Sequence, residues 1–133
     1  MKNFYIFIFL LFLMSGCSQT IYPNHKLEDS LNKVLEKDNL VDFNLKTFAK
    51  FNWDKAYIIA PYTTVDQIEK KLGFKYNGSA RMDSADHANL LVFIDNNTVV
   101  QIAEVSREFG DIYTDNKEEY IKAENPIVKI KRH

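Results

Sequence analysis

Two apolar segments separated by a short polar turn constrain the fold of this chain more than any other feature. The first segment, Leu90 to Ile94, is entirely apolar, and the polar residues Asp95 to Asn97 follow it directly. Asparagine tolerates positive φ angles, so Asp-Asn-Asn is well suited to a hairpin turn. Residues Thr98 to Val105 are then the predicted returning strand. This part of the chain therefore predicts an antiparallel β-hairpin.

Two other segments have the apolar spacing of amphipathic helices. In residues 26–37 the apolar side chains recur on one helical face; they are Leu27, Leu31, Val34 and Leu35. In the second segment Thr64 and Gln67 form a capping box, and Gly73 stands where a left-handed C-cap is expected. A further short helix is predicted over residues 117–123.

Three segments predict additional strands. Residues 41–45 alternate apolar and polar side chains, which indicates a half-buried strand. Residues 56–60 are continuously apolar and predict a central strand, which ends at Pro61 because proline has no N–H for the ladder. Residues 127–131 predict a last strand, whose lysines suit a sheet edge. We therefore expect an α+β fold, a mainly antiparallel sheet of about four to five strands with two to three short helices packed on one face.

The composition narrows the class of protein. The chain has 133 residues, which is the size of one ordinary domain. Its 17 basic and 18 acidic residues give a formal net charge of -1, which argues against a nucleic-acid binder and provides no polybasic anchor for anionic lipids. The 46% hydrophobic content is enough for a globular core. A single cysteine excludes an internal disulfide and a multi-cysteine zinc site.

The N-terminal segment combines a positive head, an apolar run and that single cysteine. Met1 to Asn3 precede eleven apolar residues, Phe4 to Met14. As a helix this run would extend about 17 Å, which is shorter than the hydrocarbon core of about 30 Å. It has the length and flanks of a signal-peptide apolar region, and the small residues Ser15 and Gly16 lead to Cys17.

The stretch Leu-Met-Ser-Gly-Cys, which ends at Cys17, resembles the lipobox of bacterial lipoproteins. The lipobox usually has leucine three places before the cysteine, where this chain has Met14. The resemblance implies that residues 1–16 are a signal peptide and that Cys17 becomes a diacylglycerol cysteine. Two or more acyl chains anchor a protein stably, whereas one binds marginally. The alternatives are a transmembrane anchor and a buried free cysteine.

This resemblance also predicts the domain organisation and the location. Residues 17–25 are expected to form the lipidated cysteine and a polar tether, and residues 26–133 a single α+β domain. The implied location is the cell envelope. In a Gram-negative cell this is the outer membrane, facing the periplasm, because Ser18 after the cysteine is not acidic. Otherwise it is the outer face of the cell membrane.

Two further resemblances involve the middle of the chain. The segment Phe51 to Thr63 (FNWDKAYIIAPYT), followed by Val65 to Phe74, resembles a recurring pattern in small, mostly uncharacterised bacterial lipoproteins. It implies family membership and export, without catalytic residues. More loosely, this helix and the hairpin are similar to the unit of outer-membrane assembly lipoproteins of the SmpA/BamE type and related β-lactamase-inhibitor-like modules. Their Gly-Met-Thr motif is replaced here by Pro61-Tyr62-Thr63. This similarity is a fold analogy.

Three aromatic residues are candidates for a recognition surface. Trp53, Tyr57 and Tyr62 lie close together in the sequence, and tryptophan and tyrosine dominate binding hot spots. The alternative is that Trp53 packs under the sheet while Asp54 bonds to backbone or pairs with Lys55 or Arg107. Residues 107–113 are predicted either as a binding loop or as a connection that covers the edge of the core.

The densest polar segment lies before the hairpin. Asp83, Asp86 and His87 have the oxygen and nitrogen atoms that bind divalent ions, and Ser84 beside His87 suggests nucleophilic catalysis. The alternative is a solvated loop, and the chain has no Gly-x-Ser-x-Gly motif. We therefore predict no metal site, no cofactor and no enzymatic activity.

These observations lead to three functional hypotheses. The first is a membrane-anchored lipoprotein that binds another envelope protein or stabilises an envelope assembly. The second is an immunity or inhibitor lipoprotein that blocks a toxin or a hydrolase. The third is a small hydrolase, which would need a deep polar pocket around Asp83, Asp86 and His87.

Overall fold

The structure is a computed structural model that describes residues 19–133, so the predicted signal peptide 1–16 and Cys17 lie outside the described residues. Its strands are β1 (Asp42–Asn44), β2 (Lys55–Ile59), β3 (Ala88–Asp95), β4 (Thr98–Ser106), β5 (Gly110–Tyr113), β6 (Tyr120–Lys122) and β7 (Ile127–Arg132). Its helices are α2 (His25–Leu35), α3 (Val65–Leu72) and a 3-10 helix at Leu45–Thr47.

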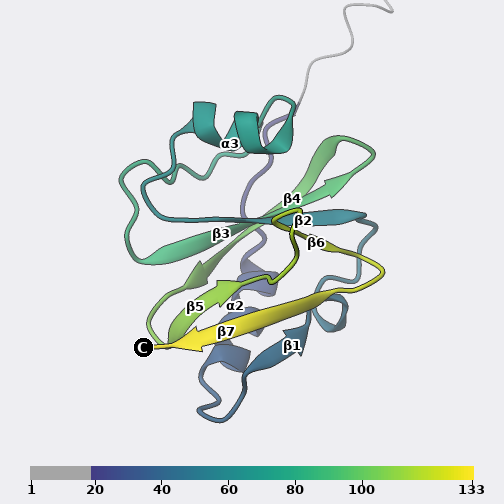
Figure 1. Cartoon of the computed structure of the whole chain (residues 1–133). Helices are drawn as coiled ribbons and strands as arrows, with labels where there is room; N and C mark the ends of the chain where they lie inside the picture. The colour runs from purple at the N-terminus through teal and green to yellow at the C-terminus, as the bar shows by residue number, and fades with distance from the viewer. Residues whose placement is uncertain (1–18) are drawn as a thin grey trace, which may run out of the picture.

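The strands form two antiparallel sheets. The larger sheet has the order β4-β3-β2-β6 and the smaller one β1-β7-β5. In Figure 1, α3 covers the upper face of the larger sheet, and α2 lies with the smaller sheet below it. The expected α+β fold with mainly antiparallel sheet is confirmed. The seven strands exceed the expected four to five, and the helices lie on opposite faces instead of one.

The continuous apolar run over residues 90–94 of β3 explains why both faces of the larger sheet are covered. Successive strand residues point to opposite faces of a sheet, so an entirely apolar strand needs a partner on each side. Leu91 and Phe93 join the core under α2 and the smaller sheet. Leu90, Val92 and Ile94 join the core under α3. All five side chains are buried.

The local turn and cap signals are confirmed. The β3–β4 turn has Asn96 and Asn97 at φ 50 and φ 58. The capping box of α3 is complete, and Gly73 ends this helix at φ 84. Each of these features depends on residues within four positions of one another, which is why the sequence predicts them well.

The predicted helix over residues 117–123 is wrong, because this segment contains strand β6. Glu119 has φ 65, which is incompatible with a continuing helix. Ile121 follows and is completely buried in the larger sheet, opposite Ala56 of β2. Pairing with a distant strand therefore decides the conformation of this segment.

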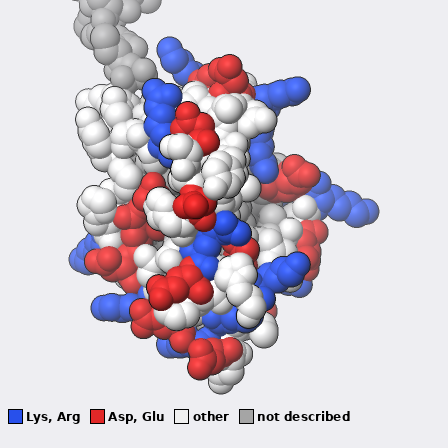
Figure 2. Space-filling view, turned by 90° about the vertical axis from the view of Figure 1, so that its left-hand side faces the viewer, with Lys and Arg blue, Asp and Glu red and all other residues white. Residues whose placement is uncertain are grey.

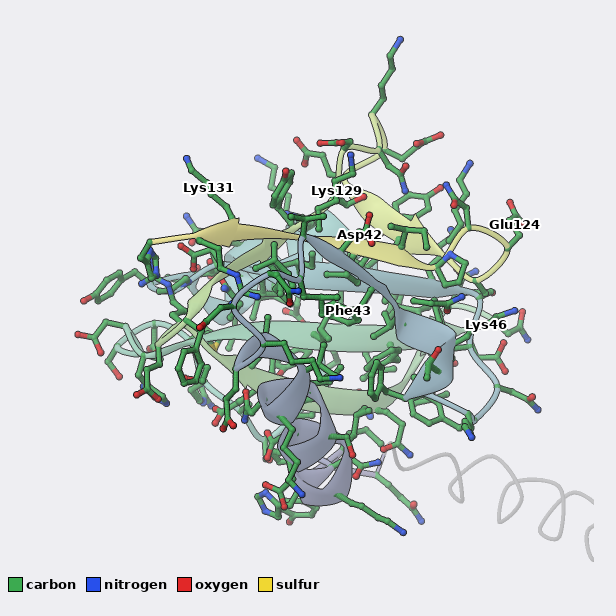
Figure 3. The ribbon with its side chains drawn as sticks, turned by 90° about the horizontal axis from the view of Figure 1, so that it is seen from below. Asp42, Phe43, Lys46, Glu124, Lys129 and Lys131 are labelled. Carbon is green, nitrogen blue, oxygen red and sulfur yellow. The ribbon has the colours of Figure 1, made fainter. Side chains whose placement is uncertain are left out.

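The C-terminal strand β7 was expected at a sheet edge and lies instead at the centre of the smaller sheet. It pairs with β1 on one side and with β5 on the other. Strand β5 comes from the segment 107–113, for which a loop was predicted. The outer face of this sheet is polar, as the labelled Asp42 and Lys129 show, whereas Phe43 is 7% exposed and faces the core (Figure 3).

A polar tether was expected over residues 17–25, and the part of it that the structure describes packs against the domain. Residues 19–24, the N-terminal segment, lie against the domain. Ile21 and Pro23 form parallel bridges with Gly78 and Ile102. Asn24 caps α2 by accepting a hydrogen bond from Leu27 N–H at 3.0 Å. Residues 19–24 therefore contact the domain that is predicted over residues 26–133.

Within residues 19–133, none of the helices is both long and apolar enough to cross a membrane.

Candidate functional site

One end of the larger sheet collects polar and aromatic groups from four separate segments. The β2–α3 turn with Tyr62 ends next to the loop before β3, since Thr63 bridges Met82. Ala88 pairs with Ser106, which brings that loop to the β4–β5 turn. Gly110 pairs with Arg132, which brings His133 to the same place. Figure 2 looks onto this end of the molecule. We call it the Tyr62 end, formed by Tyr62, Asp86, His87, Ser106, Arg107, Glu108 and His133.

Tyr62 has an unusual backbone conformation at an exposed position. Its φ angle is 63°, and 63% of its surface is exposed. For a bulky residue such a φ is an outlier with a cost of about 1–2 kcal/mol. The turn holds this conformation through Pro61 and a hydrogen bond from Thr63 Oγ1 to the Ala60 carbonyl at 2.6 Å. The fold thus presents an aromatic side chain to solvent at a conformational cost.

A shallow pocket of about 360 Å³ lies at the same end. Six residues line it: Asp86, His87, Ser106, Arg107, Glu108 and His133. Asp86, His87, Glu108 and His133 are exposed at its rim. The pocket is therefore polar, open and accessible to a large partner.

Arg107 organises the floor of this pocket. Its Nε donates to Asp111 Oδ1 at 2.6 Å, its Nη2 to Asp111 Oδ2 at 3.3 Å, and its Nη1 to the Asp86 carbonyl at 2.9 Å. The hydrogen bond with Asp111 is the largest cause of its raised pKa, and Asp86 and Tyr62 also raise it. Each of the three guanidinium nitrogens donates one hydrogen bond, so Arg107 connects the segments of this end.

Asp111 completes this network from the smaller sheet. The buried Asn89 side chain donates to its Oδ1 at 3.1 Å. The Arg107 hydrogen bond is the main cause of the lowered pKa of Asp111, and burial opposes it. His133 Nε2 lies 2.9 Å from the Arg107 carbonyl oxygen. The two sheets are therefore joined by polar contacts at this end.

The structure separates the three aromatic candidates. Trp53 is buried among the core residues on the α2 side, where its Nε1 donates to the Ala49 carbonyl at 3.1 Å. Tyr57 is buried on the α3 side, with its ring 5.3 Å from that of Tyr120. Only Tyr62 of the three is exposed. Trp53, Tyr57 and Tyr62 therefore do not form one recognition surface.

The packing alternative holds for Trp53 and its neighbour. The Trp53 ring meets Phe93 edge to face at 5.5 Å between centroids. Asp54 Oδ2 accepts a hydrogen bond from the Asn96 backbone N–H at 3.2 Å. This contact joins the start of β2 to the hairpin turn, so the Asp54 side chain bonds to backbone.

The metal candidates do not converge. Asp83, Asp86 and His87 are exposed on one loop, and only the last two line the pocket. Within residues 19–133, no group of three or more His, Cys, Asp or Glu side chains is arranged to hold a metal ion. Ser84 is not among the pocket residues either. Ser106 does line the pocket, and its hydroxyl accepts a hydrogen bond from the Glu108 N–H at 3.2 Å, which shapes the β4–β5 turn.

The arrangement at the Tyr62 end suits noncovalent recognition. An exposed aromatic ring next to polar groups is the composition of a binding hot spot with its rim. The sequence-based predictions include Tyr62, Asp86 and His87 but not His133. Arg107 lies in the segment 107–113, which was predicted as a binding loop or a connection. No local signal joins these residues, because strand pairing brings them together.

Comparisons with protein-family models, with curated proteins and with solved structures give no match for this chain.

Proposed function

We propose that this chain is a lipid-anchored envelope protein that binds another protein through the Tyr62 end. The observation that supports binding is the conformation of Tyr62. A bulky side chain at φ 63° is unfavourable, and such strain concentrates at functional sites. A glycine at this turn would avoid the cost, so we attribute the tyrosine to a function of its side chain.

A protein partner fits this end better than a small ligand. The pocket of about 360 Å³ is open and polar, whereas small-molecule sites are enclosed and mostly apolar. The positive charge of Arg107 is paired with Asp111, which weakens its attraction for a phosphate or carboxylate ligand. An exposed tyrosine with polar neighbours is typical of protein interfaces.

The anchor is supported by the sequence resemblance at Cys17. The eleven apolar residues, the Ser-Gly pair and the cysteine follow one another as in a lipobox. We expect Cys17→Ser to abolish the mass added by lipid and to release the protein from the membrane fraction. An unchanged membrane fraction without a lipid mass shift would contradict the anchor.

The binding surface can be tested with a photo-crosslinking amino acid in the producing cell. We expect a crosslinker at position 62 to give a discrete protein adduct. The matched control is position 113, since Tyr113 is also an exposed tyrosine (40%) but lies on β5. Adducts of equal yield from both positions, or from neither, would contradict binding through the Tyr62 end.

The identity of the adduct separates the two binding hypotheses. An envelope-assembly role predicts a resident envelope protein and a surface defect after deletion of the gene. An immunity role predicts that the adduct contains a toxin or a hydrolase, and that deletion of the gene causes no defect by itself.

A further inference from the structure

The N-terminal segment is held firmly against the loop that follows α3. Ile21 N–H donates to the Asn77 carbonyl at 2.9 Å, and Ser79 N–H donates to the Ile21 carbonyl at 2.8 Å. The Asn77 side chain donates to the Gln19 carbonyl at 2.6 Å. These bonds fix the position at which the described chain begins.

The predicted lipidation site is very close to this attachment. Cys17 is two residues before Gln19 in the sequence. At about 3.3–3.6 Å per residue, two residues extend no more than about 7 Å. A lipid on Cys17 would therefore hold the loop around Asn77 at the bilayer surface.

Three exposed lysines and the exposed Asp66 lie on α3 and just after it. Lys70 and Lys71, near the end of α3, and Lys75, just after it, are all exposed. The nearby Glu69 is half-buried, and its carboxylate accepts the Tyr76 N–H at 2.7 Å. At the top of Figure 2, basic side chains project from the surface, and acidic side chains lie among them. We call Lys70, Lys71, Phe74 and Lys75 the α3 surface.

A shallow apolar patch adjoins these lysines. Phe74 is half-buried and lines a depression of about 240 Å³ with the hairpin turn; the other lining residues are Lys75, Asn77, Asn97, Thr98 and Val99. An aromatic ring with lysines nearby is typical of surfaces that lie in the interfacial region of a membrane.

We propose that the α3 surface faces the membrane and that its lysines contact anionic phospholipid headgroups. This proposal rests on the lipid anchor of the proposed function. Charge complementarity supports it, because three exposed lysines meet a negatively charged surface. The short distance from Gln19 to Cys17 supports it independently, because it leaves little freedom for another face to turn toward the bilayer.

This orientation leaves the Tyr62 end accessible. The hairpin turn near Lys75 and the Tyr62 end lie at opposite ends of β3. This strand has eight residues, so at about 3.3 Å per residue it separates the two ends by about 26 Å. Lys70 and Lys71 are nearer to Tyr62, because α3 has eight residues and extends only about 12 Å. A partner could therefore approach Tyr62 from the side away from the hairpin turn while the α3 surface stays on the lipid.

Spin labels on the full lipidated chain would test the orientation. Cys17 is the single cysteine, and acylation of its sulfur leaves an introduced cysteine as the reactive thiol. We choose Lys71→Cys on the α3 surface and Ser84→Cys, exposed in the loop before β3. In vesicles of phosphatidylethanolamine with phosphatidylglycerol, we expect the label at 71 to be several-fold less accessible to an aqueous nickel chelate than the label at 84.

Mass spectrometry of the same samples distinguishes two failures. Absence of lipid on Cys17 would overturn both the anchor and the orientation. A lipidated, vesicle-bound protein with equal accessibility at positions 71 and 84 would overturn the orientation alone.

Charge reversal tests the headgroup contact. The variant K70E/K71E/K75E is compared with K46E/K50E/K131E, a matched change of three exposed lysines away from α3. Figure 3 shows Lys46 and Lys131 from below, on the side of β1 and β7. We expect phosphatidylglycerol to slow amide hydrogen exchange in residues 70–77 of the wild type and the control variant. Equal slowing in K70E/K71E/K75E would overturn the lysine contact.

Discussion

The Glu28 side chain in α2 accepts a hydrogen bond from the backbone N–H of Glu104 in β4, at 2.7 Å and across 76 positions of sequence. Glu28 is only 9% exposed, and its other carboxylate oxygen lies 2.8 Å from His25 Nδ1. This one side chain therefore fixes α2 against the edge of the larger sheet.

We expect Glu28→Ala to lower the free energy of unfolding by about 2–3 kcal/mol, because it leaves a half-buried N–H without its partner. Glu28→Gln retains an acceptor and should lose about 1 kcal/mol. Urea denaturation measures both. The exposed neighbour Asp29→Ala is the control, and a loss as large as that of Glu28→Ala would contradict this role.

Arg132 closes the other end of α2. Its guanidinium donates to the Leu35 carbonyl at 2.5 Å, to the Leu40 carbonyl at 3.0 Å and to the Lys37 carbonyl. Leu35 is the last residue of α2, so its carbonyl has no partner within the helix, and Lys37 and Leu40 belong to the segment that follows. We expect Arg132→Ala to cost about 2–3 kcal/mol, while the exposed neighbour Lys131→Ala is near neutral. Equal unfolding midpoints for the two variants would count against this cap.

Replacement of Tyr62 by glycine should raise the stability of the protein and abolish binding of the partner. Tyr62→Gly relieves a left-handed conformation that costs about 1–2 kcal/mol, partly offset by the greater freedom of glycine in the unfolded chain, about 0.5–1 kcal/mol. We therefore expect thermal unfolding at a slightly higher temperature and loss of the partner adduct. Tyr62→Ala keeps the unfavourable φ, so it should lose binding without the gain in stability. A less stable Tyr62→Gly protein would refute the strain.

Tyr76 gives the protein a specific alkaline sensitivity. Its hydroxyl donates to the Ala80 carbonyl at 2.9 Å, and burial, with a smaller effect of Glu104, raises its pKa to about 12. The pKa in the unfolded chain is about 10. A raised pKa stabilises the folded state fully below the unfolded value, and this stabilisation is lost as the pH rises from 10 toward 12.

We expect the wild type to lose on the order of 2–3 kcal/mol over this range from Tyr76. Tyr76→Phe should be about 1 kcal/mol less stable than the wild type at neutral pH, because it lacks one hydrogen bond. Its free energy of unfolding should then fall less steeply as the pH rises. Urea unfolding at increasing pH measures the slope. The exposed Tyr22→Phe is the control, and a steep decline retained in Tyr76→Phe would exclude this residue as the cause.

Asp111 provides the corresponding acid sensitivity. Its hydrogen bond with Arg107 lowers its pKa, so its contribution is present above the unfolded value of about 3.9 and is lost as the pH falls through the folded pKa. We expect Asp111→Asn to be less stable at neutral pH and to lose less stability on acidification. Asp83→Asn, in an exposed loop, should follow the wild-type curve. An unchanged acid slope in Asp111→Asn would disprove this linkage.

The success and failure of prediction follow from the range of each interaction. The Asn96–Asn97 turn and the Thr64 cap involve neighbours in the sequence, so local chemistry decides them. The segment 117–123 has a charged, helix-compatible composition but becomes β6, because Ile121 fills a core position opposite Ala56. Likewise the segment 107–113 forms β5 only because β7 is available to pair with it.

The sequence by itself determined the hairpin, the two amphipathic helices and the α+β class, because each depends on composition or on short-range spacing; the anchor at Cys17 stays a prediction. Only the tertiary structure decided which groups meet. Strand register brought Tyr62, His87, Arg107 and His133 to one end of the sheet. Docking of residues 19–24 brought the start of the described chain to the loop that follows Lys70, Lys71 and Lys75. Both outcomes depend on hydrogen bonds between distant segments, which no local pattern specifies.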